Sequence, residues 1–235
     1  MQAQFDRQIM LLGDDSLDRL RACHVAVFGI GGVGSYTAEA LARAGVGSLT
    51  LIDNDTVSLS NLNRQLIALH STVGRNKTEV MAERILDINP DCSVKALPLL
   101  YEESTKERFF SERYDYIADC IDTVSCKLSL IETALNRDIP IISSMGTGNR
   151  LDPSCFLITD LSKTSGCPLA RVMRAELKKR GIVHHTVLSS TELPKKVSSP
   201  ADVPGGRKSV PGSVSWVPSS AGLMIAGYII QQLLL

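Results

Sequence analysis

Short apolar runs alternate with longer amphipathic segments through the first part of the chain. The runs at residues 25–28, 49–52, 93–100, 114–120 and 140–143 have the length and composition of buried strands. Between them, helical spacing of apolar residues predicts one helix that ends near residue 45 and two more over 72–88 and 127–137. A short charged helix is expected over 102–112. This alternation predicts an α/β fold: a Rossmann-like, doubly wound, mostly parallel sheet with helices on both faces.

The second part of the chain departs from this rhythm. We expect strands at 156–159 and 183–188, separated by a basic helix at 169–180. Residues 189–213 are rich in Ser, Pro, Gly and Lys without a hydrophobic period, which predicts a mobile surface loop. The apolar run 221–235 forms a C-terminal extension that is too short to span a membrane, so we expect a buried helix and no stable membrane insertion.

A glycine-rich loop connects the first apolar run to the first of these helices. Gly29, Gly31, Gly32 and Gly34 include a Gly-x-Gly-x-x-Gly pattern, and the second run ends on Asp53. Glycines let backbone N–H groups approach a phosphate at the positive end of a helix, and the acid can hold a ribose hydroxyl. Because strand, loop, helix, strand and acid follow in this order, the stretch predicts a nucleotide-binding βαβ unit.

Polar residues follow the carboxyl ends of two predicted strands. Residues 54–65 come directly after Asp53, and Asp119 and Asp122 mark the end of the fourth run. Open α/β sheets bind their ligands at this edge. We therefore expect the functional residues of the first half in these segments.

Composition narrows the class of protein. Lys and Arg together number 25, as do Asp and Glu, so no global basic field favours nucleic acid and any such contact must come from local patches. The six cysteines include no C-x-x-C pair, which argues against a disulfide scaffold and a cysteine zinc site. This pattern, and an N-terminus without the layout of a signal peptide, are typical of the reducing cytoplasm.

Several motifs carry a family resemblance. In order along residues 5–145 they are FDRQIML, GIGGVGS, LIDNDTVSLSNLNRQ, VGRNK, INP and DCIDT. Together they resemble the activating-enzyme superfamily, which includes the ubiquitin-activating enzymes and the molybdopterin and thiamine adenylyltransferases. The resemblance implies one domain over 1–235, with a nucleotide-binding half at 1–145 and a substrate-facing half at 146–235. It also implies ATP and Mg²⁺ as cofactors and attack of a carboxylate on the α-phosphate, which releases pyrophosphate and leaves an acyl-adenylate.

The resemblance also assigns roles to individual residues. Asp53 would bind the ribose, whereas Asn61, Arg64 and Lys77 would face the phosphates. A carboxylate and a triphosphate repel each other, so this chemistry requires cations that hold both. A solvated surface charge is the alternative interpretation of Arg64 and of Lys77.

Two more residues complete the expected catalytic set of Arg7, Arg64, Lys77 and Asp122. Asp122 would help to hold Mg²⁺, which prefers oxygen ligands, although it could also cap the following helix. Arg7 matches the family arginine that reaches into the site of a partner subunit, which implies a homodimer. An exposed surface arginine is the alternative interpretation.

The second half resembles the bacterial tRNA threonylcarbamoyladenosine dehydratases, in the segments FLITDLSKTSGCPLARVMRAELKKRGI, LSSTELP and PGSVSWVPSSAGLMIAGYII. The resemblance implies ATP-dependent activation of the carboxylate of N6-threonylcarbamoyladenosine in tRNA, followed by ring closure with overall loss of water. It also implies a monovalent cation near Asp160. Candidate contacts to tRNA phosphates are Arg171, Arg174, Lys178, Lys179, Arg180, Lys195, Lys196 and Lys208, with a solvated helix face as the alternative.

Three other functions remain open. The first is adenylation of the C-terminus of a small ubiquitin-like sulfur carrier, with a sulfurtransferase-type protein partner. The second is an NAD-dependent oxidoreductase, because the glycine pattern also serves dinucleotides, although a hydride-transfer site has little use for Arg64 and Lys77. The third is a nucleotide-binding scaffold without catalysis. Cys126 and Cys167 are the candidates for a thioester-forming nucleophile, but neither has a neighbouring histidine in sequence.

Overall fold

The computed structural model describes residues 3–197 and 211–235. Its seven strands form one sheet in the order β3-β2-β1-β4-β5-β7-β6. Neighbouring strands are parallel except for β6, which pairs antiparallel with β7. The strands are His24–Phe28 (β1), Ser48–Ile52 (β2), Ser93–Leu97 (β3), Tyr116–Asp119 (β4), Ile141–Ser144 (β5), Phe156–Asp160 (β6) and Thr186–Ser190 (β7). The predicted doubly wound, mostly parallel sheet is confirmed.

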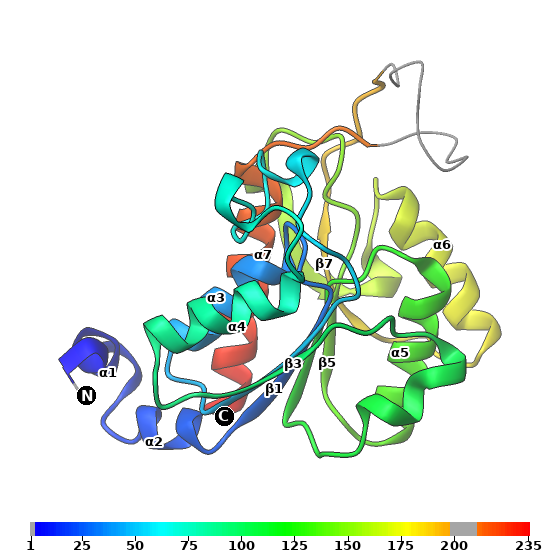
Figure 1. Ribbon diagram of the computed structural model, residues 1–235. Helices are drawn as coiled ribbons and strands as arrows, with labels where there is room; N and C mark the ends of the chain where they lie inside the picture. Colours follow the sequence, from blue (N-terminus) through cyan, green and yellow to red (C-terminus); the bar gives the residue numbers. More distant parts are fainter. Residues whose placement is uncertain (1–2, 198–210) are drawn as a thin grey trace.

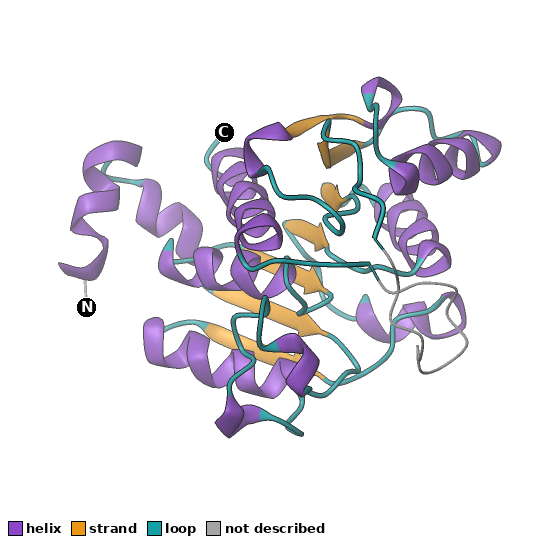
Figure 2. Ribbon diagram, turned by 90° about the horizontal axis from the view of Figure 1, so that it is seen from above, coloured by secondary structure: helices purple, strands orange, loops and turns teal. Residues whose placement is uncertain are grey.

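Helices cover both faces of the sheet (Figures 1 and 2). One face carries Gly34–Arg43 (α3), Lys77–Ile88 (α4) and Trp216–Leu233 (α7), and the other carries Val124–Asn136 (α5) and Pro168–Lys179 (α6). Two short helices, Asp6–Leu12 (α1) and Ser16–Arg21 (α2), precede the sheet. The remaining elements are single 3-10 turns at Ala3–Phe5, Leu59–Asn61, His70–Thr72, Pro153–Cys155 and Leu161–Lys163, and a longer one at Glu103–Phe109.

Several elements differ from the sequence prediction in their bounds or their type. The strand expected over 93–100 ends at Leu97, and the helix expected over 127–137 spans Val124–Asn136. The helix expected over 72–88 begins only at Lys77, because Gly74 has a φ of +88° and Asn76 is extended where it bridges to Thr56. Within the charged segment 102–112, Glu103–Phe109 forms a 3-10 helix. The last strand is β7, so residues 183–185 precede it and residues 189–190 belong to it. Most of the predicted mobile loop, 198–210, lies outside the described residues.

The C-terminal helix is a structural part of the nucleotide-binding half. A Cβ atom at Gly222 of α7 would lie 2.3 Å from the carbonyl oxygen of Val33, so only glycine permits the close approach of α7 to α3. Thr37 Oγ1 donates to the Gly222 carbonyl at 3.1 Å. The expected burial of this helix is confirmed by Val217, Ala221 and Ile225, each 0% exposed. None of the helices in the described part of the chain is long and apolar enough to cross a membrane.

Candidate nucleotide-binding site

The glycine loop lies where the strand order reverses, between β1 and β4. Gly29 has a φ of +87°, and a Cβ atom there would lie 2.7 Å from the carbonyl oxygen of Cys120. A Cβ atom at Gly34 would lie 1.7 Å from the carbonyl oxygen of Gly29. At Gly31 the nearest atom to such a Cβ is the Gln65 Nε2, at 3.8 Å. Gly29 and Gly34 therefore shape the loop, whereas Gly31 leaves space in front of it.

Asp53 is tied to this loop. It follows β2, and its Oδ2 accepts a hydrogen bond from the Ile30 N–H at 2.7 Å, while its Oδ1 accepts one from the Asp55 N–H at 2.8 Å. Burial raises the pKa of the Asp53 carboxyl group, against the opposing effects of Lys77 and the two N–H donors. The side chain thus positions the loop in addition to the ribose contact expected of it.

Lys77 begins α4 and is almost entirely buried. Its side chain is 6% exposed, and its Nζ lies 2.7 Å from the Oδ2 of Asp55, which is 62% exposed. Asp55 was missed at the sequence level, although its position two residues after Asp53 could have marked it. The alternative of a freely solvated lysine is wrong, because the ammonium group is held at the carboxyl edge of the sheet.

Arg64 lies against the glycine loop. Its Cγ would be 3.6 Å from a Cβ atom at Gly32, and its Nη1 donates to the Ser60 carbonyl and to Asn63 Oδ1 at 2.8 and 3.0 Å. Burial lowers the pKa of the guanidinium. No carboxylate pairs with it among residues 3–197 and 211–235. An anionic ligand at the loop would therefore find a guanidinium without an ionic partner.

Two neighbouring amides complete this segment. Asn61 is 8% exposed, and its Oδ1 accepts from the Ser58 N–H at 3.1 Å, which closes the turn before Arg64. Gln65 is also 8% exposed, and its Oε1 has no hydrogen-bond partner in the described structure. A buried polar atom without a partner is costly, so Gln65 is a further candidate ligand-binding residue. The motif NLNRQ contained it, but no single-residue signal distinguished it.

Asp122 follows β4 at the same edge of the sheet and is exposed. Its Oδ1 accepts a hydrogen bond from Thr123 Oγ1 at 3.3 Å. No group of three His, Cys, Asp or Glu side chains that could hold a metal ion occurs in the described residues. Mg²⁺ at nucleotide sites is usually held by one or two carboxylates together with phosphate oxygens, so a single exposed aspartate fits this ion.

Other predicted residues lie outside this site. The helix α1, which carries Arg7, projects at one end of the molecule, away from the segment after β2 (Figure 1). On α6, Arg174 is tied to the protein: its Nη1 donates to the carbonyls of Leu161 and Thr164 at 3.1 and 2.8 Å. Arg174 is therefore held by the protein itself, in contrast to the exposed Arg171 and Lys178 on the same helix.

The two candidate cysteines lack the surroundings of a nucleophile. Cys126 and Cys167 are 8% and 5% exposed, and burial raises the pKa of the Cys126 thiol, which favours the unreactive protonated form. The neighbouring histidines are engaged elsewhere, His184 with Asp160 and His185 with Ser143.

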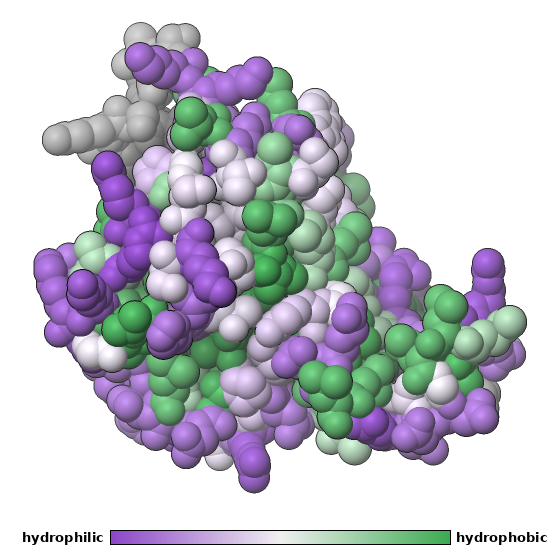
Figure 3. Space-filling model, turned by 180° about the vertical axis from the view of Figure 1, so that it is seen from behind, coloured by the Kyte–Doolittle hydropathy of each residue, from purple (hydrophilic) through white to green (hydrophobic). Residues whose placement is uncertain are grey.

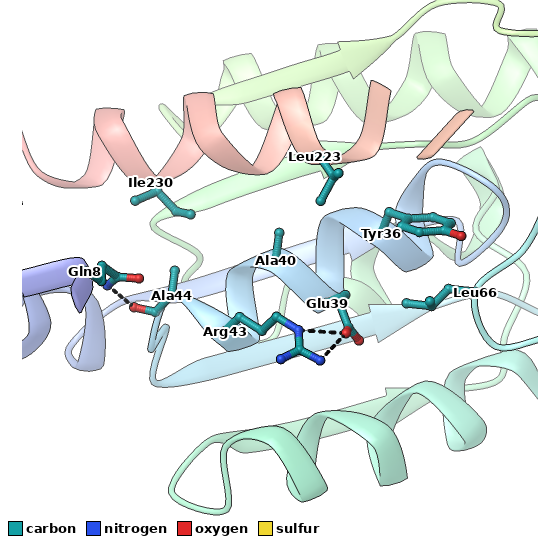
Figure 4. Close-up of a pocket in the computed structure, with 9 residues that line it drawn as sticks. All are labelled: Gln8, Tyr36, Glu39, Ala40, Arg43, Ala44, Leu66, Leu223 and Ile230. Carbon is teal, nitrogen blue, oxygen red and sulfur yellow. Dashed lines mark hydrogen bonds and ion pairs between the residues drawn. The ribbon is translucent and has the colours of Figure 1, made fainter. Parts of the chain in front are cut away.

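A groove of about 450 Å³ lies apart from the glycine loop (Figure 4). It runs between α3 and α7, next to α1, where Gln8 Nε2 donates to the Ala44 carbonyl at 2.8 Å. Its lining residues are Gln8, Tyr36, Glu39, Ala40, Arg43, Ala44, Leu66, Leu223 and Ile230. None of the loop glycines or phosphate-facing candidates belongs to it, so this groove is not the nucleotide site.

A glycine loop lies at the switch point of a doubly wound sheet, with a buried lysine at the same edge and an arginine that pairs with no carboxylate of the described residues. This arrangement defines a nucleotide-binding protein suited to anionic phosphates. Comparison with known proteins gives the family. The chain belongs to the ThiF family, whose model matches residues 5–234.

Its relatives are similar over most of the chain. It is 45% identical to the tRNA threonylcarbamoyladenosine dehydratase of Bacillus subtilis, over 98% of this chain and 94% of that protein. It is 43% identical to the corresponding Escherichia coli protein, over 74% of this chain and 65% of the relative. The molybdopterin-synthase adenylyltransferase of Escherichia coli is 35% identical over 66% of this chain and 62% of that protein.

Solved structures agree with this placement. The Escherichia coli tRNA N6-threonylcarbamoyladenosine dehydratase in complex with AMP has a TM-score of 0.90 at 34% identity, with 99% of this chain and 94% of that chain covered. Its complex with ATP has a TM-score of 0.88 at 35% identity, with the same coverage. These likenesses confirm the predicted fold and favour an ATP-dependent activity over the NAD-dependent alternative.

Proposed function

We propose that this protein uses ATP to activate the carboxylate of N6-threonylcarbamoyladenosine in tRNA and drives its dehydrative cyclisation. The observation that carries the proposal is the 45% identity to a dehydratase of that name over 98% of the chain. The second candidate, adenylation of a small sulfur carrier, has support over a shorter part of the chain, at 35% identity over 66%.

The proposed reaction has two steps, adenylation of the carboxylate and ring closure. The carboxylate oxygen attacks the α-phosphorus of ATP, pyrophosphate leaves, and an acyl-adenylate forms. The threonyl hydroxyl or the amide system then attacks the activated carbonyl, AMP leaves, and the ring closes. Water is lost overall, because the carboxylate oxygen departs with AMP and a proton leaves the attacking group.

The site residues have distinct tasks in this proposal. The loop of Gly29, Gly31, Gly32 and Gly34 presents backbone N–H groups to the phosphates, and Asp53 takes the ribose. Lys77 and Arg64 reduce the repulsion between the carboxylate and the triphosphate and stabilise charge on the leaving pyrophosphate, while Asn61 supports the turn that carries Arg64. Asp122 would help to hold Mg²⁺, and that ion would supply further shielding of phosphate charge.

tRNA binds on α6 in this proposal. Arg171 and Lys178 are exposed, lie seven residues apart on one side of the helix and have no ion pair within the described structure. Lys179 and Arg180 pair with Glu176 and Glu132 at 2.6 Å each and contribute less. Lys195 and Lys196 are exposed and are further candidate contacts, and Lys208 lies beyond the described residues.

A homodimer completes the site. Met10 and Leu11 of α1 are 84% and 87% exposed, and hydrophobic side chains gather on the face seen in Figure 3, which includes this projecting arm. A second copy that covers α1 and the groove of Figure 4 would bury these residues and carry Arg7 toward the partner's site. A monovalent cation near Asp160, a sulfurtransferase-type partner and a cytoplasmic location remain part of the same proposal.

Mass analysis of nucleosides tests this function. Threonylcarbamoylated tRNA is incubated with the protein, ATP and Mg²⁺, and digested to nucleosides. We expect the modified adenosine to lose one water, only when ATP is present, and not with the Lys77→Met variant. If the nucleoside is unchanged, the tRNA substrate is ruled out. Pyrophosphate exchange with small carrier proteins then tests the second candidate function.

A further inference from the structure

Two charged side chains are fully buried beside the glycine loop and have no task in the chemistry above. Asp119 ends β4 and Lys127 lies in the first turn of α5, and both side chains are 0% exposed. Lys127 Nζ lies 2.9 Å from Asp119 Oδ2. The desolvation of a buried ion pair offsets much of its attraction, so such a pair adds little net stability. Stability alone therefore does not account for this pair.

The pair fixes the backbone turn that follows β4. Lys127 Nζ donates to the carbonyl oxygen of Ile121 at 3.0 Å. Asp119 Oδ1 accepts a hydrogen bond from the Ile121 N–H at 3.2 Å. Both polar groups of Ile121 are thus held by the ion pair, and the next residue is Asp122, the proposed Mg²⁺ ligand.

The same turn supports the glycine loop. The Cys120 N–H donates to the Phe28 carbonyl at 2.8 Å, and the Cys120 carbonyl oxygen lies against Gly29, where a Cβ atom would be 2.7 Å away. A displacement of this turn would therefore move the start of the glycine loop.

A hydrogen-bond chain connects the pair to the second half of the molecule. Ser143 Oγ of β5 donates to Asp119 Oδ2 at 2.6 Å, and His185 Nε2 lies 2.8 Å from the same Oγ. Because the Ser143 proton is directed to Asp119, His185 Nε2 is the donor to Ser143. The Asp119 carboxylate thereby has three donors from three segments, which defines its orientation.

We propose that Asp119 and Lys127 are positioning residues that hold the turn of residues 120–122 against the glycine loop and so set the geometry of the nucleotide site. The effect on Asp122 rests on the proposed function, whereas the effect on Gly29 does not. Since neither side chain is accessible, they act through the backbone and touch no ligand.

Neutralisation of the pair tests this role. The double variant Asp119→Asn/Lys127→Met removes both charges, whereas Lys127→Met alone leaves a lone buried carboxylate. We expect the single variant to unfold at a clearly lower temperature and the double variant to recover most of that loss. The double variant should nevertheless bind both AMP and Mg²⁺-ATP at least about tenfold more weakly by calorimetry, because small displacements in a site are costly.

Three further variants make the result decisive. Lys95→Met/Glu112→Gln neutralises an exposed ion pair elsewhere and should change neither affinity. Ser143→Ala removes one donor to Asp119 and should weaken AMP binding measurably. If the double variant does not fold, this variant tests the positioning role instead. Asp122→Asn should weaken the binding of Mg²⁺-ATP but not of AMP. If this variant binds Mg²⁺-ATP as well as the unmodified protein does, the assignment of Asp122 to Mg²⁺ is overturned. The positioning role of Asp119 and Lys127 is then judged from the AMP affinities alone. AMP affinity equal to that of the unmodified protein, in a folded double variant or in Ser143→Ala, overturns the positioning role.

Discussion

At the scale of single residues, the four glycines of the loop have different tasks. Gly34 allows the chain to close on itself, since its Cα lies against the Gly29 carbonyl, whereas Gly31 borders open space next to Gln65. The sequence pattern treats them alike. The atoms around each Cα show which glycine is required for folding and which leaves space for a ligand.

This difference gives the first prediction. Gly34→Ala should lower the free energy of unfolding by about 2–3 kcal/mol or prevent folding, because a methyl group there overlaps the backbone. Gly31→Ala should change the free energy of unfolding by less than about 1 kcal/mol, because Gly31 has no positive φ and a methyl group there meets no close atom. It should nevertheless weaken ATP binding, because the methyl group occupies space that a phosphate needs. Chemical denaturation and calorimetry measure the two effects. Equal losses of stability in both variants would contradict this division of roles.

His185 gives a prediction about pH. Burial lowers the pKa of His185 to about 4, well below its ordinary value of 6.5. Between pH 6.5 and pH 4 the unfolded chain therefore takes up a proton that the folded protein does not. The contribution of His185 to the free energy of unfolding is fully present above pH 6.5 and is lost as the pH falls toward 4. The loss attributable to this group is about 3 kcal/mol.

His185→Gln removes the titrating ring and retains a donor for Ser143. We expect this variant to lose markedly less stability than the unmodified protein when urea unfolding is compared at pH 7 and at about pH 4.5. His70→Gln, an exposed histidine, is the control and should leave the pH dependence unchanged. An identical pH dependence in His185→Gln would assign the acid sensitivity to other groups.

At the scale of elements, α6 shows that a basic helix is not uniform. The sequence predicted a basic helix whose arginines and lysines are all candidates for phosphate contacts. In the structure Arg174 donates to carbonyls of the segment that precedes the helix, while Arg171 and Lys178 stay exposed. The partners of Arg174, Leu161 and Thr164, lie ten or more residues away along the chain. No helical periodicity could therefore identify them.

The exposed and the anchored basic residues of α6 should respond differently to mutation. Arg171→Ala/Lys178→Ala should weaken tRNA binding and reduce its salt dependence by about two counterions, without loss of stability. Arg174→Met should instead cost about 1–3 kcal/mol of stability, because two carbonyls lose their donor. Filter binding across a salt series and thermal unfolding measure these effects. Unchanged tRNA affinity in the double variant would remove α6 from the tRNA surface.

At the scale of the whole molecule, the proposed site depends on a second copy. The exposed apolar residues of α1 and the groove between α3 and α7 form the surface that the proposed second copy would cover. Arg7 can serve the nucleotide site only from a partner, because its own α1 projects away from that site (Figure 1).

Complementation tests this arrangement. Arg7→Ala and Lys77→Met should each be nearly inactive alone. After dissociation and reassociation of an equal mixture, half of the dimers are mixed and each contains one intact site, so activity should return to about a quarter of the unmodified value. Sedimentation with Leu11→Lys, expected to be monomeric, is the companion measurement. A mixture without recovered activity would remove Arg7 from the partner's site.

The sequence by itself determined the sheet, the glycine loop with Asp53, and the polar segments that follow the parallel strands. These features depend on local patterns: apolar runs of strand length, glycines at fixed spacing, and polar residues after parallel strands. Tertiary structure alone decided how the charges are used. The pairing of Lys77 with Asp55, the burial of Lys127 with Asp119 and the anchoring of Arg174 each join residues eight to twenty-two positions apart. A charge in a sequence does not show whether it will meet water, a carbonyl or a carboxylate, because that depends on which elements pack together.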